Sequence, residues 1–485
     1  MSFERAEITL FIAGWAATVC SAITGSFIVL DIGLLALGLT GVMRIAMLVL
    51  DRNRSWSVCA IFAGGLMPSY FIGAFVTLVQ YDPNSPYFTL PLGDDFITTA
   101  PLVILDISLF YWVLIGLAKI ETRWWQKTLA VLNTAEAWKK DEAIRPAIAF
   151  ALTVVTALQM FLFLTGQVTL NGLDASEDSH LPMGIIIIMN LADAVLGISA
   201  WIIGRWRKPW GLVAMAVVTS AWQIVWLGGM GRRTLLYGAV LFFSVFIWAR
   251  GGRINRRFFY LAVPTLGVVY FFTKLFIAMR YANYAYASAG TQQSLVTLYS
   301  DAFSLISTDA DTVAELEKEN YSSRFFIFGY LSLTIHGLAL PMAQFGKFLF
   351  IAMFSSIPSA LFPDKVDIMM KNGWFGDGKG LLNDILSLEQ VDFAWTPVVT
   401  SYADFMWLGP FLYPLFMLLL GWIFTRLVQS IRSPTLIIGC LGTCLMEFLG
   451  TEEGMSVYIL AGRTLAFIWL FAKIVEYFGR PAISK

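Results

Sequence analysis

The chain has 485 residues, of which 58% are hydrophobic and 14% charged, and its 33 basic and 33 acidic residues give no net charge. Soluble domains carry about 25% charged residues, so this composition, with a mean hydropathy of +0.71, predicts an all-α polytopic membrane protein. The apolar runs are too long and too uniform for the short alternating strands of a membrane barrel. The balanced charge also argues against a nucleic-acid partner.

The first part of the chain is predicted to form a transmembrane bundle over residues 1–279. The N-terminal residues are too few and too acidic for a cleaved signal peptide, so we expect the first apolar run to remain as a membrane helix. Segment 119–145 mixes Trp and Leu with Lys and Arg, which is typical of a helix on the inner membrane surface. The predicted spans cover about residues 8–30, 32–50, 56–80, 97–119, 146–168, 183–203, 210–230, 234–249 and 258–279.

Residues 280–404 are predicted to form one large loop, and residues 405–485 are predicted to hold the last spans, at about 405–428, 434–450 and 456–477. This gives about 12 transmembrane helices in one integrated membrane domain. Basic and acidic loops alternate along the chain, so the positive-inside rule places the basic loops and both termini in the cytoplasm. The loop 280–404 is then expected on the outer, periplasmic side of a bacterial inner membrane.

The apolar middle of this loop, residues 325–354, breaks the pattern. A single crossing would invert every later loop, so the segment should cross the membrane zero or two times. Gly337, Pro341 and Gly346 interrupt it, which favours a re-entrant or broken hairpin, with an interfacial segment as the alternative. The acidic run at 307–320 is predicted to form a short solvated helix.

Four arginines fall where the positive-inside rule disfavours them: Arg232, Arg233, Arg280 and Arg324. Interfacial arginines usually face a polar cavity or a ligand, and the guanidinium fork matches phosphate oxygens. They therefore predict an anionic head group bound at the outer leaflet. The alternative is that each arginine reaches lipid phosphate or a neighbouring carboxylate.

Three more residues are candidates for chemistry. His336 is either a proton-transfer or sugar-binding residue or a satisfied structural histidine. Lys365 follows a proline-rich turn and either points at a phosphate or sugar or snorkels. Asp404 lies one helical turn after Thr400 at a predicted helix start, so it either orients a sugar hydroxyl or an arginine, or caps the helix.

Other charged residues lie within predicted spans. Arg44 could reach the inner surface, and Asp106 and Asp193 could pair with arginines.

The remaining motifs predict neither a metal site nor a cofactor. The four cysteines lie in apolar spans, and Cys440 and Cys444, one turn apart, have no further ligands nearby. The sequence has no Walker A, HExxH or GxSxG motif. It also has no convincing inverted repeat, which weakens a transporter interpretation.

Three segments resemble motifs of the Wzy-type O-antigen and oligosaccharide repeat-unit polymerases, over about residues 225–430. "GRRTLL" at 231–236 looks like the family's outward-facing arginine pair, and "SSIPSALFPDKV" at 355–366 is similar to its proline–lysine turn. "TSYADFMWLGP" at 400–410 resembles the start of a late span, with Tyr402, Phe405 and Gly409 matching. The departures from the family pattern are Ser359 for Arg, Val366 for Pro and Met406 for Gly.

The resemblance implies a glycosyltransferase of the membrane C-type superfamily, which needs no cofactor. Such enzymes join undecaprenyl-diphosphate-linked oligosaccharides into O-antigen or a related polysaccharide by displacement at the anomeric carbon. The site it implies is distributed along the chain: Arg232, Arg233 and Arg280 would hold the leaving diphosphate; Arg324 and Lys365 would grip the acceptor's diphosphate or help the donor's; Tyr402 would contact diphosphate or glycan; and His336 or Asp404 would take the acceptor's proton.

The alternatives are an O-antigen ligase, another lipid-linked glycosyltransferase or an enzyme that acylates glycans, and a transporter or flippase for lipid-linked sugars. The partners expected are lipid-linked oligosaccharides and the lipid bilayer, with a chain-length regulator protein as a further candidate.

Overall fold

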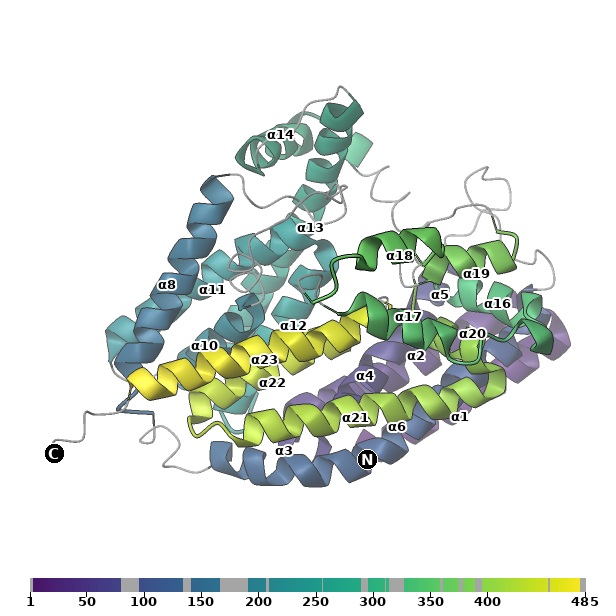
Figure 1. Ribbon diagram of the computed structural model, residues 1–485, viewed down its shortest axis with the longest axis horizontal. Coiled ribbons are helices and arrows are strands. Elements are labelled where there is room, and N and C mark those ends of the chain that lie inside the picture. Colours follow the sequence, from purple (N-terminus) through teal and green to yellow (C-terminus); the bar gives the residue numbers. More distant parts are fainter. Residues whose placement is uncertain are drawn as a thin grey trace. The chain divides into compact units, whose positions relative to one another are not determined.

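The fold is helical throughout the part of the chain that the computed structural model describes (Figure 1). The described residues are 3–79, 96–133, 141–165, 191–205, 209–254, 256–288, 295–309, 311–313, 327–357, 361–374, 378–388, 395–451 and 454–479. Within these ranges there is no strand. The all-helical class predicted from composition is therefore confirmed.

Among these residues, nine helical segments are long and apolar enough to cross a membrane, or ten if one bent pair is counted as a span. The nine are α1 (Phe3–Thr24), α2 (Phe27–Leu50), α4 (Val58–Met67) continuing to α5 (Gly73–Val79), α6 (Phe96–Asn133), α8 (Arg145–Leu164), α11 (Trp210–Met230), α13 (Arg256–Ser288), α20 (Pro397–Phe405) continuing to α21 (Gly409–Gln429), and α23 (Met455–Phe478). Three shorter helices, α10 (Ala192–Arg205), α12 (Arg232–Ala249) and α22 (Pro434–Leu449), coincide with the other predicted spans. A multi-pass membrane protein is thus supported, and the count of about 12 stays a prediction.

The helices form two compact units that interleave along the sequence. Unit 1 contains residues 1–126, 320–425 and 447–463. Unit 2 contains residues 127–319, 426–446 and 464–485.

In unit 1, α1 and α2 pack closely through small residues. A Cβ atom added to Gly14 would lie 3.0 Å from the carbonyl oxygen of Gly33, and one added to Gly33 would lie 3.0 Å from that of Gly14. Side chains that small let two apolar helices approach without an aqueous driving force. A buried ion pair joins the same helices, because Arg44 donates to both carboxylate oxygens of Glu7 at 2.6 Å. The structure thus gives Arg44 a partner that the sequence analysis did not identify, the buried carboxylate of Glu7.

Several helix starts in the two units are capped by carboxylates from elsewhere in the chain. In unit 1, Glu121 of α6 accepts from the backbone nitrogens of Val58 (2.8 Å) and Cys59 (3.0 Å), at the start of α4, and from Trp125 Nε1 (2.9 Å). The end of α6 therefore packs into the protein, with Trp125 and Leu129 buried. Residues 119–133 continue α6 without a break, with Arg123 and Lys127 exposed, so the position of segment 119–145 on the inner membrane surface stays a prediction.

In unit 2, two carboxylates meet the start of α22. Glu476 accepts from the nitrogens of Arg432 (2.6 Å) and Ser433 (2.8 Å), and Asp141 accepts from Thr435 N (3.1 Å). The amide protons at a helix start have no partner within the helix, and they carry its partial positive charge. These carboxylates accept hydrogen bonds from the unpaired amide protons, and their negative charge is attracted to the partial positive charge of the helix start.

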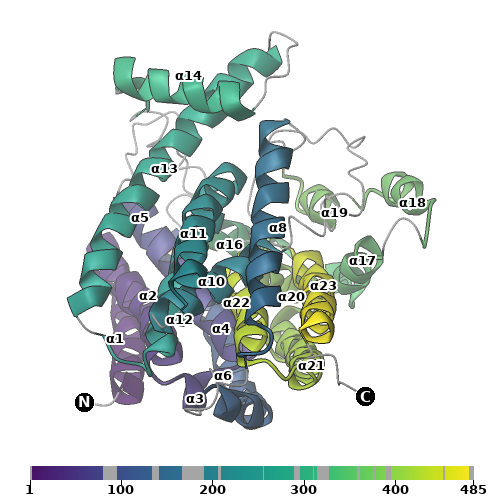
Figure 2. The same ribbon diagram turned by 90° about the vertical axis from the view of Figure 1, so that its left-hand side faces the viewer.

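A helix absent from the sequence prediction, α14 (Leu295–Thr308), lies across the end of α13 (Figure 2). Tyr286 of α13 donates to Asp301 Oδ2 of α14 at 2.8 Å, and Tyr299 donates to the carbonyl of Val225 at 3.2 Å. The acidic segment at 307–320, predicted as a short helix, lies mostly outside the described residues.

Candidate functional site

The segment predicted to be re-entrant is a broken pair of helices in unit 1. Helix α16 (Ile327–Gly337) is followed by a single 3₁₀ turn (Leu340–Met342) and by α17 (Lys347–Ser355), and the two arms are bent by 111°. Gly346, with a φ of 88°, occupies the left-handed region just before α17. The predicted break in this apolar segment is therefore confirmed.

Asp404 caps the start of α17. Its Oδ1 accepts from Phe348 N at 2.9 Å, and its Oδ2 accepts from Leu349 N at 3.0 Å and from the Tyr413 hydroxyl at 2.7 Å. The backbone of the same segment adds a further bond, from Phe345 N to the Asp404 carbonyl at 2.8 Å. The expectation that Asp404 begins its own helix is wrong, because it lies in the last turn of α20. It does cap a helix, but that helix is α17.

Lys365 closes the other end of α17. It is the first residue of α18 (Lys365–Lys371), and its Nζ donates to the carbonyls of Ser355 (2.9 Å) and Ile357 (2.7 Å). Burial, and then the nearby positive charge of Arg463, lower the pKa of the Lys365 ammonium. A negative group at the start of a helix and a positive group at its end both interact favourably with the helix dipole. The two side chains therefore fix α17 from both ends.

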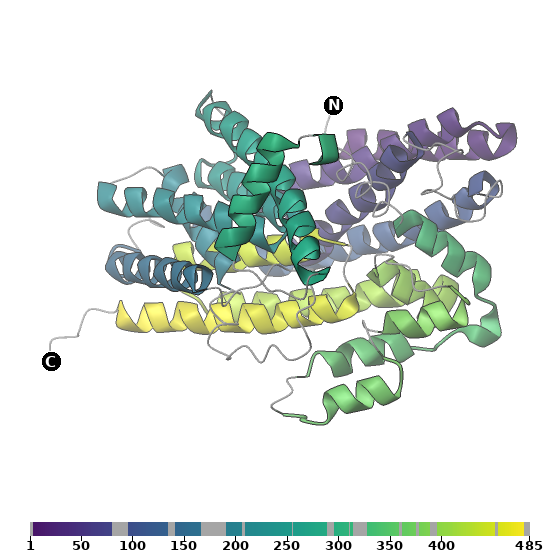
Figure 3. The same cartoon turned by 90° about the horizontal axis from the view of Figure 1, so that it is seen from above.

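Aromatic packing holds the rest of this region together. Trp395 packs edge-on against Phe348 of α17 at 5.5 Å, and Tyr330 of α16 donates to Asn383 of α19 (Lys379–Ile385) at 2.8 Å. Within unit 1, α17 and α18 lie on the side opposite to α1 and α2 (Figures 2 and 3).

The other candidates in unit 1 differ in their exposure. His336 lies in the last turn of α16, next to the break, and is exposed. Tyr402 is only 2% exposed and packs edge-on against Trp407. Asp106, which the sequence suggested would pair with an arginine, is fully buried, and neither of its carboxylate oxygens has a partner among the described residues. Of these three side chains, only His336 is accessible to a substrate.

The arginine candidates belong to unit 2. Arg232 and Arg233 begin α12 directly after Gly231, whose φ is 146°. Helix α13 returns along α12 after a short loop, so Arg280, in its second half, lies toward the same end of this hairpin. Arg324 lies outside the described residues. Three of the four predicted arginines thus lie on the α12–α13 hairpin, and their convergence on one site stays a prediction.

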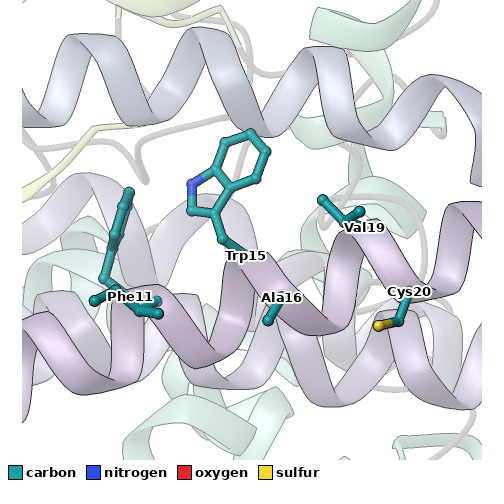
Figure 4. Close-up of a pocket in the computed structure, with 6 residues that line it drawn as sticks. Phe11, Trp15, Ala16, Val19 and Cys20 are labelled. Carbon is teal, nitrogen blue, oxygen red and sulfur yellow. The ribbon is translucent and has the colours of Figure 1, made fainter.

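No group of three or more His, Cys, Asp or Glu side chains in the described ranges could hold a metal ion. A shallow groove of about 500 Å³ lies on one face of α1, lined by Phe11, Ile12, Trp15, Ala16, Val19 and Cys20 (Figure 4). In that view Trp15 projects toward a neighbouring helix, and its Nε1 donates to Ser108 Oγ at 3.0 Å. This apolar lining fits hydrocarbon and offers no group for acid–base chemistry.

Comparison with known proteins gives no relative: no family model, curated protein or solved structure matches the chain.

Proposed function

We propose that this chain is a membrane-embedded glycosyltransferase that polymerises undecaprenyl-diphosphate-linked oligosaccharide units at the periplasmic face of a bacterial inner membrane. One observation carries the proposal. The two segments of unit 1 that resemble polymerase motifs, 355–366 and 400–410, supply the groups that hold the two ends of α17. Two motifs that are far apart in sequence therefore stabilise the same helix, α17, and the exposed His336 lies next to the break that precedes this helix.

The proposed reaction is a single displacement. The acceptor's hydroxyl oxygen attacks the anomeric carbon of the donor, the bond from that carbon to the diphosphate oxygen breaks, and the diphosphate leaves with the bonding electrons. An imidazole nitrogen of His336 takes the proton of the hydroxyl. We prefer His336 to Asp404 for this role because the Asp404 carboxylate already accepts three hydrogen bonds.

The arginines of the α12–α13 hairpin and Lys365 are proposed to bind the diphosphate groups of the lipid-linked substrates. Arg232, Arg233 and Arg280 are proposed to offset the charge that develops on the leaving diphosphate. Lys365, with Arg324, is proposed to grip the diphosphate of the acceptor. Fixed cations of this kind stabilise an anionic leaving group without reorganising during the reaction.

The experiment that tests the function is deletion of the gene in its host, followed by electrophoresis of the surface polysaccharide. A polymerase predicts lipid capped with a single repeat and no ladder of longer chains. The Arg232→Ala, Arg233→Ala and Arg280→Ala variants should also lose the ladder while inserting normally. Complete loss of capping would instead identify a ligase or a flippase and would reject the proposal.

A further inference from the structure

Arg463, which belongs to none of the three motifs, lies in the apolar part of helix α23, ten positions before the next charged residue, Lys473. Arg463 lies eight positions after the first residue of the helix, Met455. Its side chain is half-buried, and its Nε is buried without a hydrogen-bond partner among the described residues. A guanidinium in an apolar span is costly, and such residues usually face a polar cavity or a ligand.

The end of α17 lies close to the first turn of α23, the helix that carries Arg463. Ser356 Oγ, which donates to the Ala352 carbonyl at 2.7 Å, lies 3.4 Å from the carbonyl oxygen of Ser456, so the end of α17 meets the first turn of α23. Arg463 follows Ser456 by seven residues, or two turns, so both lie on one face of the helix. Helical side chains lean toward the N-terminus, which directs Arg463 back toward Ser456.

Lys365 lies at the same junction. Its Nζ binds the carbonyls of Ser355 and Ile357, the two neighbours of Ser356. Burial, and then the positive charge of Arg463, lower the pKa of this ammonium. The ion pairs found in the described ranges involve other residues, so no carboxylate of those ranges neutralises the two cations. Two like charges held together are unfavourable until an anion joins them.

We propose that Lys365 and Arg463 form a binding site for the phosphate group of a lipid, namely the diphosphate of the lipid-linked substrate. The site rests on the proposed function for this choice of lipid. The Lys365 ammonium has three N–H donors, of which two are engaged, so one remains for a phosphate oxygen. The guanidinium of Arg463 offers the planar fork that matches two further oxygens.

Binding of undecaprenyl diphosphate to the purified full-length protein in nanodiscs tests the site directly. Arg463→Gln and Lys365→Gln should each weaken binding about 10- to 100-fold, since each removes charge-assisted hydrogen bonds. Lys371→Gln is the matched control, because it removes an exposed lysine from the other end of α18, and it should change affinity less than twofold.

Thermal unfolding separates a binding role from a structural one. Arg463 Nε has no hydrogen-bond partner among the described residues, so Arg463→Gln should leave the unliganded protein as stable as the wild type or more so. Should that variant fail to fold, a structural role for Arg463 is indicated and the site is rejected. An independent measurement on the wild type needs no variant: undecaprenyl diphosphate should raise the pKa of Lys365, and an unchanged titration overturns the proposal.

The remaining outcomes identify the source of the phosphate. If phosphatidylglycerol binds as tightly as undecaprenyl diphosphate, and the variants lose both, the site takes a phospholipid head group and the substrate assignment is overturned. Specific binding of the diphosphate, together with a normal polysaccharide ladder in the deletion strain, would keep this site and reject the polymerase function. Loss of the ladder in the deletion strain without specific binding of the diphosphate would keep the polymerase function and reject this site.

Discussion

Asp404 and Lys365, 39 positions apart, bind opposite ends of the same nine-residue helix, α17. A helix this short is marginal by itself in water, because nucleation is costly and few hydrogen bonds follow it. Capping at both ends therefore determines whether α17 forms and how it is oriented. From the sequence, each residue was either a substrate contact or a structural residue, and the structure gives each of them a backbone partner.

The first prediction concerns the Asp404 cap. Asp404→Asn removes the charge from two hydrogen bonds to α17, so we expect the free energy of unfolding to fall by about 2 kcal/mol. Thermal unfolding in detergent, with limited proteolysis at the 340–360 segment, measures the effect. Asp384→Asn makes the same chemical change at an exposed site on α19 and should alter stability by less than about 0.5 kcal/mol. Unchanged stability with loss of polymerisation would instead favour Asp404 as the proton acceptor.

The second prediction concerns His336. Because the side chain is exposed, His336→Ala should change the free energy of unfolding by less than about 0.5 kcal/mol. Loss of a general base should lower the rate of polymerisation about 100-fold or more. The rate of ladder formation in reconstituted membranes is the measurement. A variant that polymerises at the wild-type rate removes His336 from the mechanism.

The third prediction is a pH dependence at Lys365. Its pKa is lowered from 10.5 in the folded protein, by burial and by Arg463. Between that lowered value and 10.5 the unfolded chain binds the proton and the folded chain does not, so this group makes stability rise with pH in that window. Arg463→Gln should raise the pKa of Lys365 and narrow the window. Titration of isotopically methylated lysines by NMR measures the shift, and an unaltered Lys365 titration would show that the two charges do not interact.

The fourth prediction concerns the close approach of α21 to Glu121. A Cβ atom on Gly421 would lie 2.5 Å from the Glu121 carboxylate oxygen, so Gly421→Ala must displace the group that caps α4. We expect a loss of about 2 to 3 kcal/mol, measured by thermal unfolding. Gly116→Ala, on α6 itself, is the matched control.

A Cβ atom on Gly116 would meet no atom within 4 Å, so its replacement should be neutral or stabilise the helix by up to about 1 kcal/mol. Equal effects of the two alanine substitutions would mean that Gly421 does not accommodate Glu121.

The fifth prediction concerns the Glu7–Arg44 pair. Arg44→Ala leaves a buried carboxylate without its partner, which should destabilise the protein by about 3 to 5 kcal/mol. The double variant Glu7→Gln with Arg44→Met removes both charges and should recover most of that loss. Denaturant unfolding of the single and double variants gives the coupling. No recovery in the double variant would show that the two charges do not act as a pair.

Local signals were sufficient to place most of the helices and the break at Gly337 and Gly346, because backbone preference and apolar length are properties of neighbouring residues. A local signal for the start of α20 was also present. Thr396 precedes Pro397, and its Oγ1 accepts from Val399 N at 3.2 Å, as an N-cap does. Recognising that cap would have placed Asp404 at the end of the helix.

The partners of Asp404, Glu121 and Arg44 could not be predicted in the same way, because each lies on another helix and depends on how the helices pack. Arg463 gave only a weak signal, a single arginine within an apolar run. Its meaning depends on Ser356 and Lys365, which come about 100 residues earlier.

Two of the carboxylates that cap distant helix starts are translated after the helices they cap, which imposes an order on folding. Residues 347–349 leave the ribosome before Asp404 does, and Val58 leaves before Glu121. Each early helix must therefore wait, with its first amide groups unsatisfied, until a later segment is translated and inserted. A nascent chain arrested before residue 404 should hold α17 in a protease-sensitive form, and release of the next few dozen residues should protect it.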